Sequence, residues 1–334
     1  MRVMEVREPG GPLTLVERAL PEPGPGEVRI AVAACGICHS DAFVKLGMFR
    51  GIAYPRVPGH EVAGTIDALG EGVGVWKLGD RVGVGWHGGH CFECDPCRRG
   101  HFINCQRGKI TGITHDGGYA EYMISPWEAV ARLPDSLDFV DAGPLLCAGV
   151  TTYNALRNSG ARAGDTVAVQ GIGGLGHLAL QYAAKMGFRT VAISRGPDKA
   201  ALAMELGASV YVDARAEDPV AALRALGGAD LILATAPSAE AINAMPHALT
   251  ARGKLMLLAA PPDKLQLSGM NLLTGKHVQG WSTGTAIDSE DTVNFSVLTG
   301  VKPRIELYGL EQANEAFARM MANEARFRVV LKIR

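Results

Sequence analysis

The 334-residue sequence predicts an α/β fold, in which a doubly wound parallel sheet is joined to a mostly β domain. Two observations support this prediction. Between Asp165 and about Gly280, strand-like apolar runs alternate with stretches rich in Ala and Leu, which is the rhythm of βαβ units. Up to about residue 145, short runs of apolar and β-branched residues are separated by Gly and Pro, as in irregular β domains. The length accommodates two domains, each able to bury a core.

The expected elements follow in chain order. In the first segment, residues 27–37 and 61–70 are typical of strands. The second segment has five expected strands, at 166–170, 190–194, 209–213, 230–235 and 254–260. Between them lie expected helices at 175–186, 199–206, 219–226 and 239–249. The chain ends with an expected helix at 310–322 and a strand at 326–333, which we expect to rejoin the first domain.

These elements predict two domains. The catalytic domain is expected to comprise residues 1–148 and 285–334, with a metal-binding lobe at 88–108. The nucleotide domain is expected at 149–284.

Charge and hydropathy exclude several classes of partner. Lys and Arg number 33 and Asp and Glu 34, for a net charge of −1, which gives no electrostatic case for nucleic acid or an anionic membrane. The longest apolar runs, such as 255–262, are far shorter than the roughly 18 residues of a membrane span. The charged N-terminus has no apolar signal core. We therefore expect a cytoplasmic protein.

A glycine-rich loop follows the strand at 166–170. It reads Gly171-Ile172-Gly173-Gly174-Leu175-Gly176 and leads into an expected helix. This G-x-G-x-x-G arrangement allows a tight turn, close approach to a pyrophosphate, and close helix–strand packing. A plain turn is the alternative, but the βαβ context favours a dinucleotide-binding Rossmann domain. The expected cofactor contacts in this loop are Gly171, Gly173, Gly174, Leu175 and Gly176.

The next strand bears on the choice of cofactor. NAD-binding domains usually place Asp or Glu near its end, on the ribose 2′-OH. Here the strand ends with Ser194 and Arg195, which would suit a 2′-phosphate. We therefore expect NADP(H), with NAD(H) as the alternative and Lys199 as a further contact. The alternative for Arg195 is an exposed loop residue or one that stacks on adenine.

Seven cysteines are too few for a disulfide scaffold, but their placement points to metal. Four thiolates at this short spacing can close a tetrahedral structural zinc site, and the surrounding segment has few aliphatic residues to form a core. The alternatives are reduced structural cysteines or two disulfides. The four are Cys91, Cys94, Cys97 and Cys105.

A second set of candidate ligands is dispersed. It consists of Cys38, His60 and Cys147, and spacing alone does not bring these residues together. Cys35 and Cys38 have the spacing of a redox pair, but no thioredoxin-like strand–helix context surrounds them.

The motifs together resemble the zinc-dependent alcohol dehydrogenases of the medium-chain dehydrogenase/reductase family, over essentially the whole chain. The chain is most similar to the short, microbial and yeast-like branch, which implies a GroES-like catalytic domain and a homo-oligomer, a tetramer or a dimer. The residues that carry the resemblance are Cys35–Asp41, Gly59–Gly64, the Cys91–Cys105 quartet, Cys147–Tyr153 and the Gly171–Gly176 loop.

The resemblance implies a role for each matched position. Cys38, His60 and Cys147 would hold a catalytic zinc, giving two zinc ions per chain with the quartet. Glu61 would lie behind the metal as an occasional ligand, and Asp41 would orient His60.

It also implies how substrate and cofactor are handled. Ser40 would bond the substrate oxygen and start proton transfer. His39 and Arg328 would reach the cofactor. Some relatives end the proton relay with a histidine at the position of Phe43, so the proton must leave here by another route.

Substrates are expected to be primary alcohols and their aldehydes, aliphatic or aromatic. Phe49, Trp86 and His115 fall in segments that line the pocket in relatives, with ordinary packing as the alternative. The alternative functions are a cinnamyl-alcohol-type aldehyde reductase, a zinc-free quinone or enoyl reductase, and a zinc-binding redox-sensing or interaction protein. The full ligand triad argues against the zinc-free enzymes. The triad and the glycine loop argue against the non-enzyme.

Overall fold

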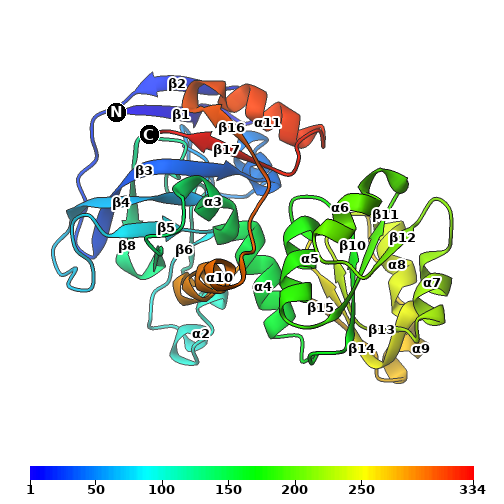
Figure 1. Ribbon diagram of the computed structural model, residues 1–334. Coiled ribbons are helices and arrows are strands. Elements are labelled where there is room, and N and C mark those ends of the chain that lie inside the picture. The colour runs from blue at the N-terminus through cyan, green and yellow to red at the C-terminus, as the bar shows by residue number, and fades with distance from the viewer. The chain divides into compact units, whose positions relative to one another are not determined.

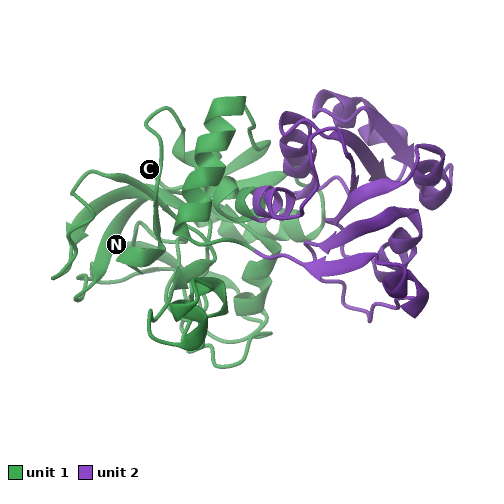
Figure 2. Cartoon of the chain, turned by 90° about the horizontal axis from the view of Figure 1, so that it is seen from below, with its two compact units in different colours: residues 1–150, 283–334 green, residues 151–282 purple.

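The computed structural model describes all 334 residues, which divide into two compact units. Unit 1 comprises residues 1–150 and 283–334, and unit 2 comprises residues 151–282, coloured green and purple in Figure 2. No helix is long and apolar enough to cross a membrane.

Unit 1 is built on a seven-stranded, mostly antiparallel sheet in the order β16-β17-β3-β4-β5-β9, with β8 also paired to β3 (Figure 1). The long strand β3 is the centre of this sheet, because it pairs with β17, β4 and β8. Its bounds, Glu27–Ile37, are those expected from the sequence. The C-terminal strand β17 returns to β3, as expected. The β1-β2 hairpin and a second antiparallel pair, β6-β7, complete the unit.

The strands of unit 1 are β1 Arg2–Val6, β2 Leu13–Glu17, β3 Glu27–Ile37, β4 Val62–Leu69, β5 Arg81–Val84, β6 His87–Gly89, β7 Lys109–Ile110, β8 Tyr122–Pro126, β9 Val130–Arg132, β16 Ile305–Gly309 and β17 Arg328–Lys332. Its helices are α1 Ala42–Lys45, α2 Asp95–Arg98, α3 Phe139–Pro144, α10 Ala286–Thr299 and α11 Ala313–Met321. Helix α4 (Val150–Arg157) begins at the last residue of the unit's first segment.

Unit 2 is a six-stranded parallel sheet in the order β12-β11-β10-β13-β14-β15. This strand order confirms the doubly wound fold class. Its central strand β10 is buried along its whole length, because helices cover the sheet (Figure 1). The strands are β10 Thr166–Gln170, β11 Arg189–Ser194, β12 Val210–Asp213, β13 Ala229–Ala234, β14 Leu249–Leu257 and β15 His277–Gly280. The helices are α5 Gly176–Lys185, α6 Ala200–Glu205, α7 Pro219–Ala225, α8 Ala239–Ala244 and α9 Gly269–Leu273.

The shape of the glycine loop depends on two of its glycines, Gly171 and Gly176. Gly171 has φ +97°, which only glycine adopts without strain. A Cβ atom on Gly176 would lie 1.9 Å from the carbonyl oxygen of Gly171. The same atom on Gly173 would meet nothing within 4 Å. Gly176 is therefore required by packing, whereas Gly173 faces open space.

This contrast predicts the effect of two alanine substitutions on stability. Gly176→Ala should lower the free energy of unfolding by about 1–3 kcal/mol, because the loop must move to admit the methyl group. Gly173→Ala is the matched control and should leave it within about 0.5 kcal/mol. Urea denaturation of the nucleotide-free protein measures both. Equal stability of the two variants would contradict this account of the loop.

Candidate active site

The first cysteine of the dispersed set stands at the end of the central strand of unit 1. Cys38 follows β3 and precedes a short turn of 3₁₀ helix, His39–Asp41. The carboxylate of Asp41 turns back and accepts the backbone N–H of Cys38 at 2.8 Å. This bond closes the turn and fixes the direction of the Cys38 side chain.

The same carboxylate positions His60. Its Oδ1 lies 3.1 Å from Nδ1 of His60 and accepts the backbone N–H of Gly59 at 3.2 Å. His60 is 1% exposed and Asp41 3% exposed, so water does not compete for this contact. With Nδ1 engaged by Asp41, the other nitrogen, Nε2, is directed at Cys147, 3.5 Å from its Sγ.

Cys147 lies in a π-helical turn, Leu145–Gly149, between α3 and α4. Pro144 precedes this turn, and the N–H of Val150 donates to the carbonyl of Leu145, five residues back. Such single π turns often occur at functional sites. The turn brings Cys147 Sγ to 3.8 Å from Cys38 Sγ.

The structure thus assembles a four-residue cluster from segments far apart in sequence. One donor atom each from Cys38, His60, Glu61 and Cys147 lies within 4.8 Å of the others. None of the seven cysteines forms a disulfide. Two thiols and an imidazole suit zinc, and three ligands of this kind leave one tetrahedral position open, as in catalytic zinc sites.

Glu61 lies behind this cluster, paired with Arg328. The Arg328 guanidinium donates to Oε1 of Glu61, and both residues are buried. Burial raises the pKa of Glu61 to about 7, although the charge of Arg328 opposes the rise. The second carboxylate oxygen, Oε2, is buried with no partner, as an occasional metal ligand would be. Arg328, expected at the cofactor, is therefore turned into the protein interior.

Tyr119 supports Asp41 from the other side. Its hydroxyl donates to Oδ2 of Asp41 at 2.8 Å, and the side chain is fully buried. Burial raises the pKa of Tyr119 well above its usual value, so the hydroxyl stays protonated and keeps donating. The sequence offered no signal for this residue, because the contact joins positions 78 residues apart.

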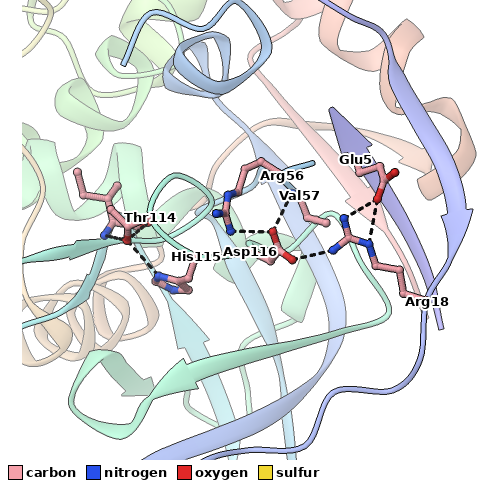
Figure 3. A network of polar contacts seen from close by, with 8 residues as sticks. Glu5, Arg18, Arg56, Val57, Thr114, His115 and Asp116 are labelled. Carbon is pink, nitrogen blue, oxygen red and sulfur yellow. Dashed lines mark hydrogen bonds and ion pairs between the residues drawn. The ribbon is translucent and has the colours of Figure 1, made fainter. Parts of the chain in front are cut away.

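Hydrogen bonds between two loops fix the position of His60. Residues 117–119 donate three backbone N–H bonds to residues 57–59. Beside them, Asp116 accepts from Nη1 of Arg56 at 2.9 Å and from the N–H of Val57 at 3.0 Å, as Figure 3 shows. Arg18 donates to the other oxygen of Asp116 and is itself paired with Glu5. The segment before His60 is thus tied to the N-terminal hairpin.

An aromatic wall adjoins the cluster. The Trp86 ring meets that of His60 edge-on at 4.9 Å, and Phe43 meets Trp86 edge-on at 6.2 Å. Phe49 extends the wall, with its ring centroid 6.4 Å from that of Phe43. His115, expected to line the same pocket, points instead toward Thr114, with Nδ1 3.3 Å from Oγ1 (Figure 3). Ser40 is half-buried and His39 exposed, directly after Cys38.

The four clustered cysteines also converge, around the short helix α2. Cys105 Sγ lies 3.5 Å from Cys91 Sγ and 3.8 Å from Cys94 Sγ, and Cys97 Sγ lies 4.0 Å from Cys91 Sγ. Backbone N–H groups, that of Cys94 first, lower the pKa of Cys91 to about 6. All four sulfurs lie within 4.8 Å of one another, with the closed donor set of a structural zinc site.

In unit 2, the expected cofactor residues gather at the ends of β10 and β11. Lys199 Nζ donates to the carbonyl of Ile172 in the glycine loop at 2.7 Å. Ser194 is the last residue of β11, and Arg195 after it is exposed. The sheet thus brings the loop and the Ser194–Arg195 pair to one edge, where dinucleotides bind in this fold.

The support of Asp41 by Tyr119 can be tested through metal affinity. Tyr119→Phe should weaken zinc binding at the Cys38 cluster by about tenfold, at the lower end of what the loss of a partner behind a metal ligand costs. Competition with a chromogenic chelator measures the affinity, and Cys147→Ser identifies the signal of the other metal site. Tyr182→Phe, equally buried but in unit 2, is the matched control. Unchanged zinc affinity in Tyr119→Phe would contradict the role.

His115 should make stability depend on pH. Burial, followed by the nearby cations Lys109 and Arg56, lowers its pKa to about 4. Unfolded histidine titrates near 6.5, so below that pH the unfolded chain binds the additional proton. From pH 7 to 5, the free energy of unfolding should fall by about 1–2 kcal/mol through this residue.

Removing this histidine should remove its share of the pH dependence. His115→Gln should flatten the fall between pH 7 and 5 by that amount, measured by urea denaturation. His277→Gln, at an exposed histidine of β15, should not change it. A fall in His115→Gln as steep as in the original protein would show that the imidazole titrates normally.

Comparison with known proteins agrees with this geometry. Residues 24–135 match the family model for the alcohol dehydrogenase GroES-like domain, and residues 174–297 that for zinc-binding dehydrogenases. An alcohol dehydrogenase of Penicillium expansum, patD, is 47% identical, covering 97% of this chain and 95% of the relative.

Two solved structures are similar over nearly the whole chain. A cinnamyl alcohol dehydrogenase of Sorghum bicolor has a TM-score of 0.90 at 32% identity, covering 99% of this chain and 97% of that one. A Helicobacter pylori enzyme described as CAD, in complex with NADP(H), has a TM-score of 0.87 at 28% identity, with the same coverage. The chain belongs to the zinc-binding alcohol dehydrogenases of the medium-chain dehydrogenase/reductase family.

Proposed function

We propose that the protein is an NADP(H)-dependent alcohol dehydrogenase/aldehyde reductase that binds two zinc ions per chain and acts on primary alcohols and their aldehydes. The observation that carries the proposal is the cluster of Cys38, His60 and Cys147. It offers three zinc ligands and no fourth one of the same kind. A carboxylate oxygen of Glu61 lies within 4.8 Å of these ligand atoms, and this side chain is also paired with Arg328.

The chemistry of the site divides between the metal and the protein. Zinc, when bound by this donor set, acts as a Lewis acid on the oxygen of an alcohol or aldehyde. The two cysteines offset the metal charge as thiolates, and Asp41 keeps Nε2 of His60 free to bind by engaging Nδ1. Ser40 lies two residues after Cys38, and its hydroxyl would take the proton of a substrate hydroxyl. The cofactor, when bound, would supply a nicotinamide that exchanges hydride with the substrate carbon, and the glycine loop would hold its pyrophosphate.

Proton transfer beyond Ser40 follows a different course from that in relatives with a histidine at position 43. Phe43 has no group that can take a proton, and its ring packs against Phe49 and Trp86. We propose that the proton would pass from Ser40 to solvent by way of water and, when the cofactor is bound, its ribose hydroxyl. The pH dependence of the rate should then lack the contribution of a histidine at this position.

The aromatic wall supports the proposed substrate class. Phe43, Phe49 and Trp86 offer flat apolar faces beside His60, which suit an aryl or alkyl chain better than the hydroxyls of a polyol. The Sorghum bicolor neighbour is named for an aromatic alcohol, which agrees with a cinnamyl-type aldehyde as one substrate of this class.

The preference for NADP(H) rests on the end of β11. Ser194 and Arg195 stand where a carboxylate would bond the ribose 2′-OH of NAD, and the Helicobacter pylori neighbour is a complex with NADP(H). A cytoplasmic homo-oligomer, a tetramer or a dimer, is part of the same proposal and rests on the family resemblance.

The proposal is tested by steady-state kinetics of zinc-loaded protein with benzaldehyde. The expected kcat/KM is at least tenfold higher for NADPH than for NADH, about 1.4 kcal/mol of discrimination. Benzyl alcohol and 1-butanol should be oxidised faster than 2-butanol and sorbitol. Metal analysis should find two zinc ions per chain, one of them absent from Cys147→Ser. A higher kcat/KM with NADH, or sorbitol as the best substrate, would overturn the corresponding part.

A further inference from the structure

The turns that follow β11 and β12 lie side by side in unit 2. The two strands are parallel neighbours, and Ser194 at the end of β11 pairs with Asp213 at the end of β12. The next residues of both strands therefore leave the sheet at the same edge. On the β11 side this is the Ser194–Gly196 turn, where the ribose end of a bound dinucleotide is expected.

Asp213 ties the two turns together. Its Oδ1 accepts the N–H of Gly196 at 2.6 Å and the N–H of Arg215 at 2.9 Å. The hydroxyl of Tyr211, also from β12, donates to the carbonyl of Gly196. Because these bonds involve the backbone of both turns, they fix where residue 215 stands relative to residues 194–196. The Asp213 carboxylate therefore accepts hydrogen bonds from backbone N–H groups of both turns.

The guanidinium of Arg215 lies over the β11 turn. Its Nη1 is 3.5 Å from the position that a Cβ atom would take on Gly196. Gly196 has φ +81° and no side chain, so the arginine can approach the backbone directly. Arg195, from the turn itself, is exposed. A carboxylate oxygen of Asp198 lies 3.9 Å from the same Cβ position on Gly196, so one acidic group is also near this turn.

We infer that Arg215 is a second cation for the 2′-phosphate of NADP(H), acting with Arg195 on the same group. The inference deepens the proposed function and rests on its preference for NADP(H). In the dinucleotide-binding fold, the end of the second strand marks the ribose 2′ position. Here the guanidinium of Arg215 lies over the turn that bears Arg195, and no carboxylate occupies position 194. A doubly charged phosphate can be bonded by both guanidinium groups, whereas a ribose hydroxyl cannot use their charge.

The test measures binding without turnover. Isothermal titration gives the Kd of zinc-loaded protein for 2′,5′-ADP, which carries the phosphate, and for 5′-AMP, which lacks it. Arg215→Gln should weaken the binding of 2′,5′-ADP by about tenfold, and leave that of 5′-AMP within about twofold. Its affinity for 2′,5′-ADP should also fall less steeply with added salt, because one cation is lost. Arg162→Gln, at an exposed arginine of the same unit, is the matched control and should change neither.

The outcomes separate this inference from the proposal on which it rests. If the unaltered protein binds 5′-AMP as tightly as 2′,5′-ADP, the preference for NADP(H) is wrong and the role of Arg215 falls with it. If the unaltered protein discriminates and Arg215→Gln discriminates equally well, the preference stands and the role of Arg215 is wrong. Arg195→Gln provides the comparison, since a loss in both single variants is expected when both cations bond the phosphate.

Discussion

The buried carboxylate of Asp41 is the contact on which the candidate zinc site depends. It accepts from the backbone of Cys38 and Gly59 and from the hydroxyl of Tyr119, and it faces Nδ1 of His60. These partners come from the end of β3, the segment before β4 and the segment before β8. One side chain therefore sets the relative position of two of the three expected zinc ligands. A buried carboxylate is costly unless it is fully bonded, and Asp41 has four such partners.

Close backbone packing around this carboxylate explains much of the glycine content near the site. A Cβ atom on Gly59 would lie 2.5 Å from the Tyr119 ring, and one on Gly36 would lie 1.9 Å from Glu61 Oε2. On Gly117 it would meet the carbonyl of Gly59 at 2.1 Å. The loops that bear the ligands can thus approach only where side chains are absent. The 42 glycines, which suggest many tight turns in the sequence, serve here to bring functional groups together.

Features that depend on residues close together in the sequence could be predicted, whereas features that depend on contacts between distant segments could not. The strands β3 and β10 were predicted to the residue, because alternation and bounding Gly or Pro are local signals. The cysteine quartet could be identified from spacing, because its ligands lie within one short lobe. Cys38, His60 and Cys147 required the family resemblance, since nothing local assembles residues more than 100 positions apart.

The contacts that no pattern indicated are all between distant segments. Tyr119 meets Asp41, Arg328 meets Glu61, and Arg215 meets the turn after β11 only once the sheets have formed. Arg328 shows the limit of the resemblance as well. The resemblance implies that Arg328 reaches the cofactor, yet its side chain is buried against Glu61.

The balance of charge around Glu61 explains why this carboxylate is paired with the buried Arg328. Cys38, Cys147, Asp41 and Glu61 can each become negative within one small region, and Arg328 is the arginine paired there. Four anions and one such cation leave an excess of negative charge that is costly to bury. Burial is the main cause that raises the pKa of Glu61 to about 7; Arg328 opposes the rise, and the nearby Cys38 and Asp41 add to it. A divalent cation held by the thiolates would reduce the excess to a single charge. The acidic groups are therefore in proportion to a divalent metal ion, and the ion pair with Arg328 offsets the charge of Glu61.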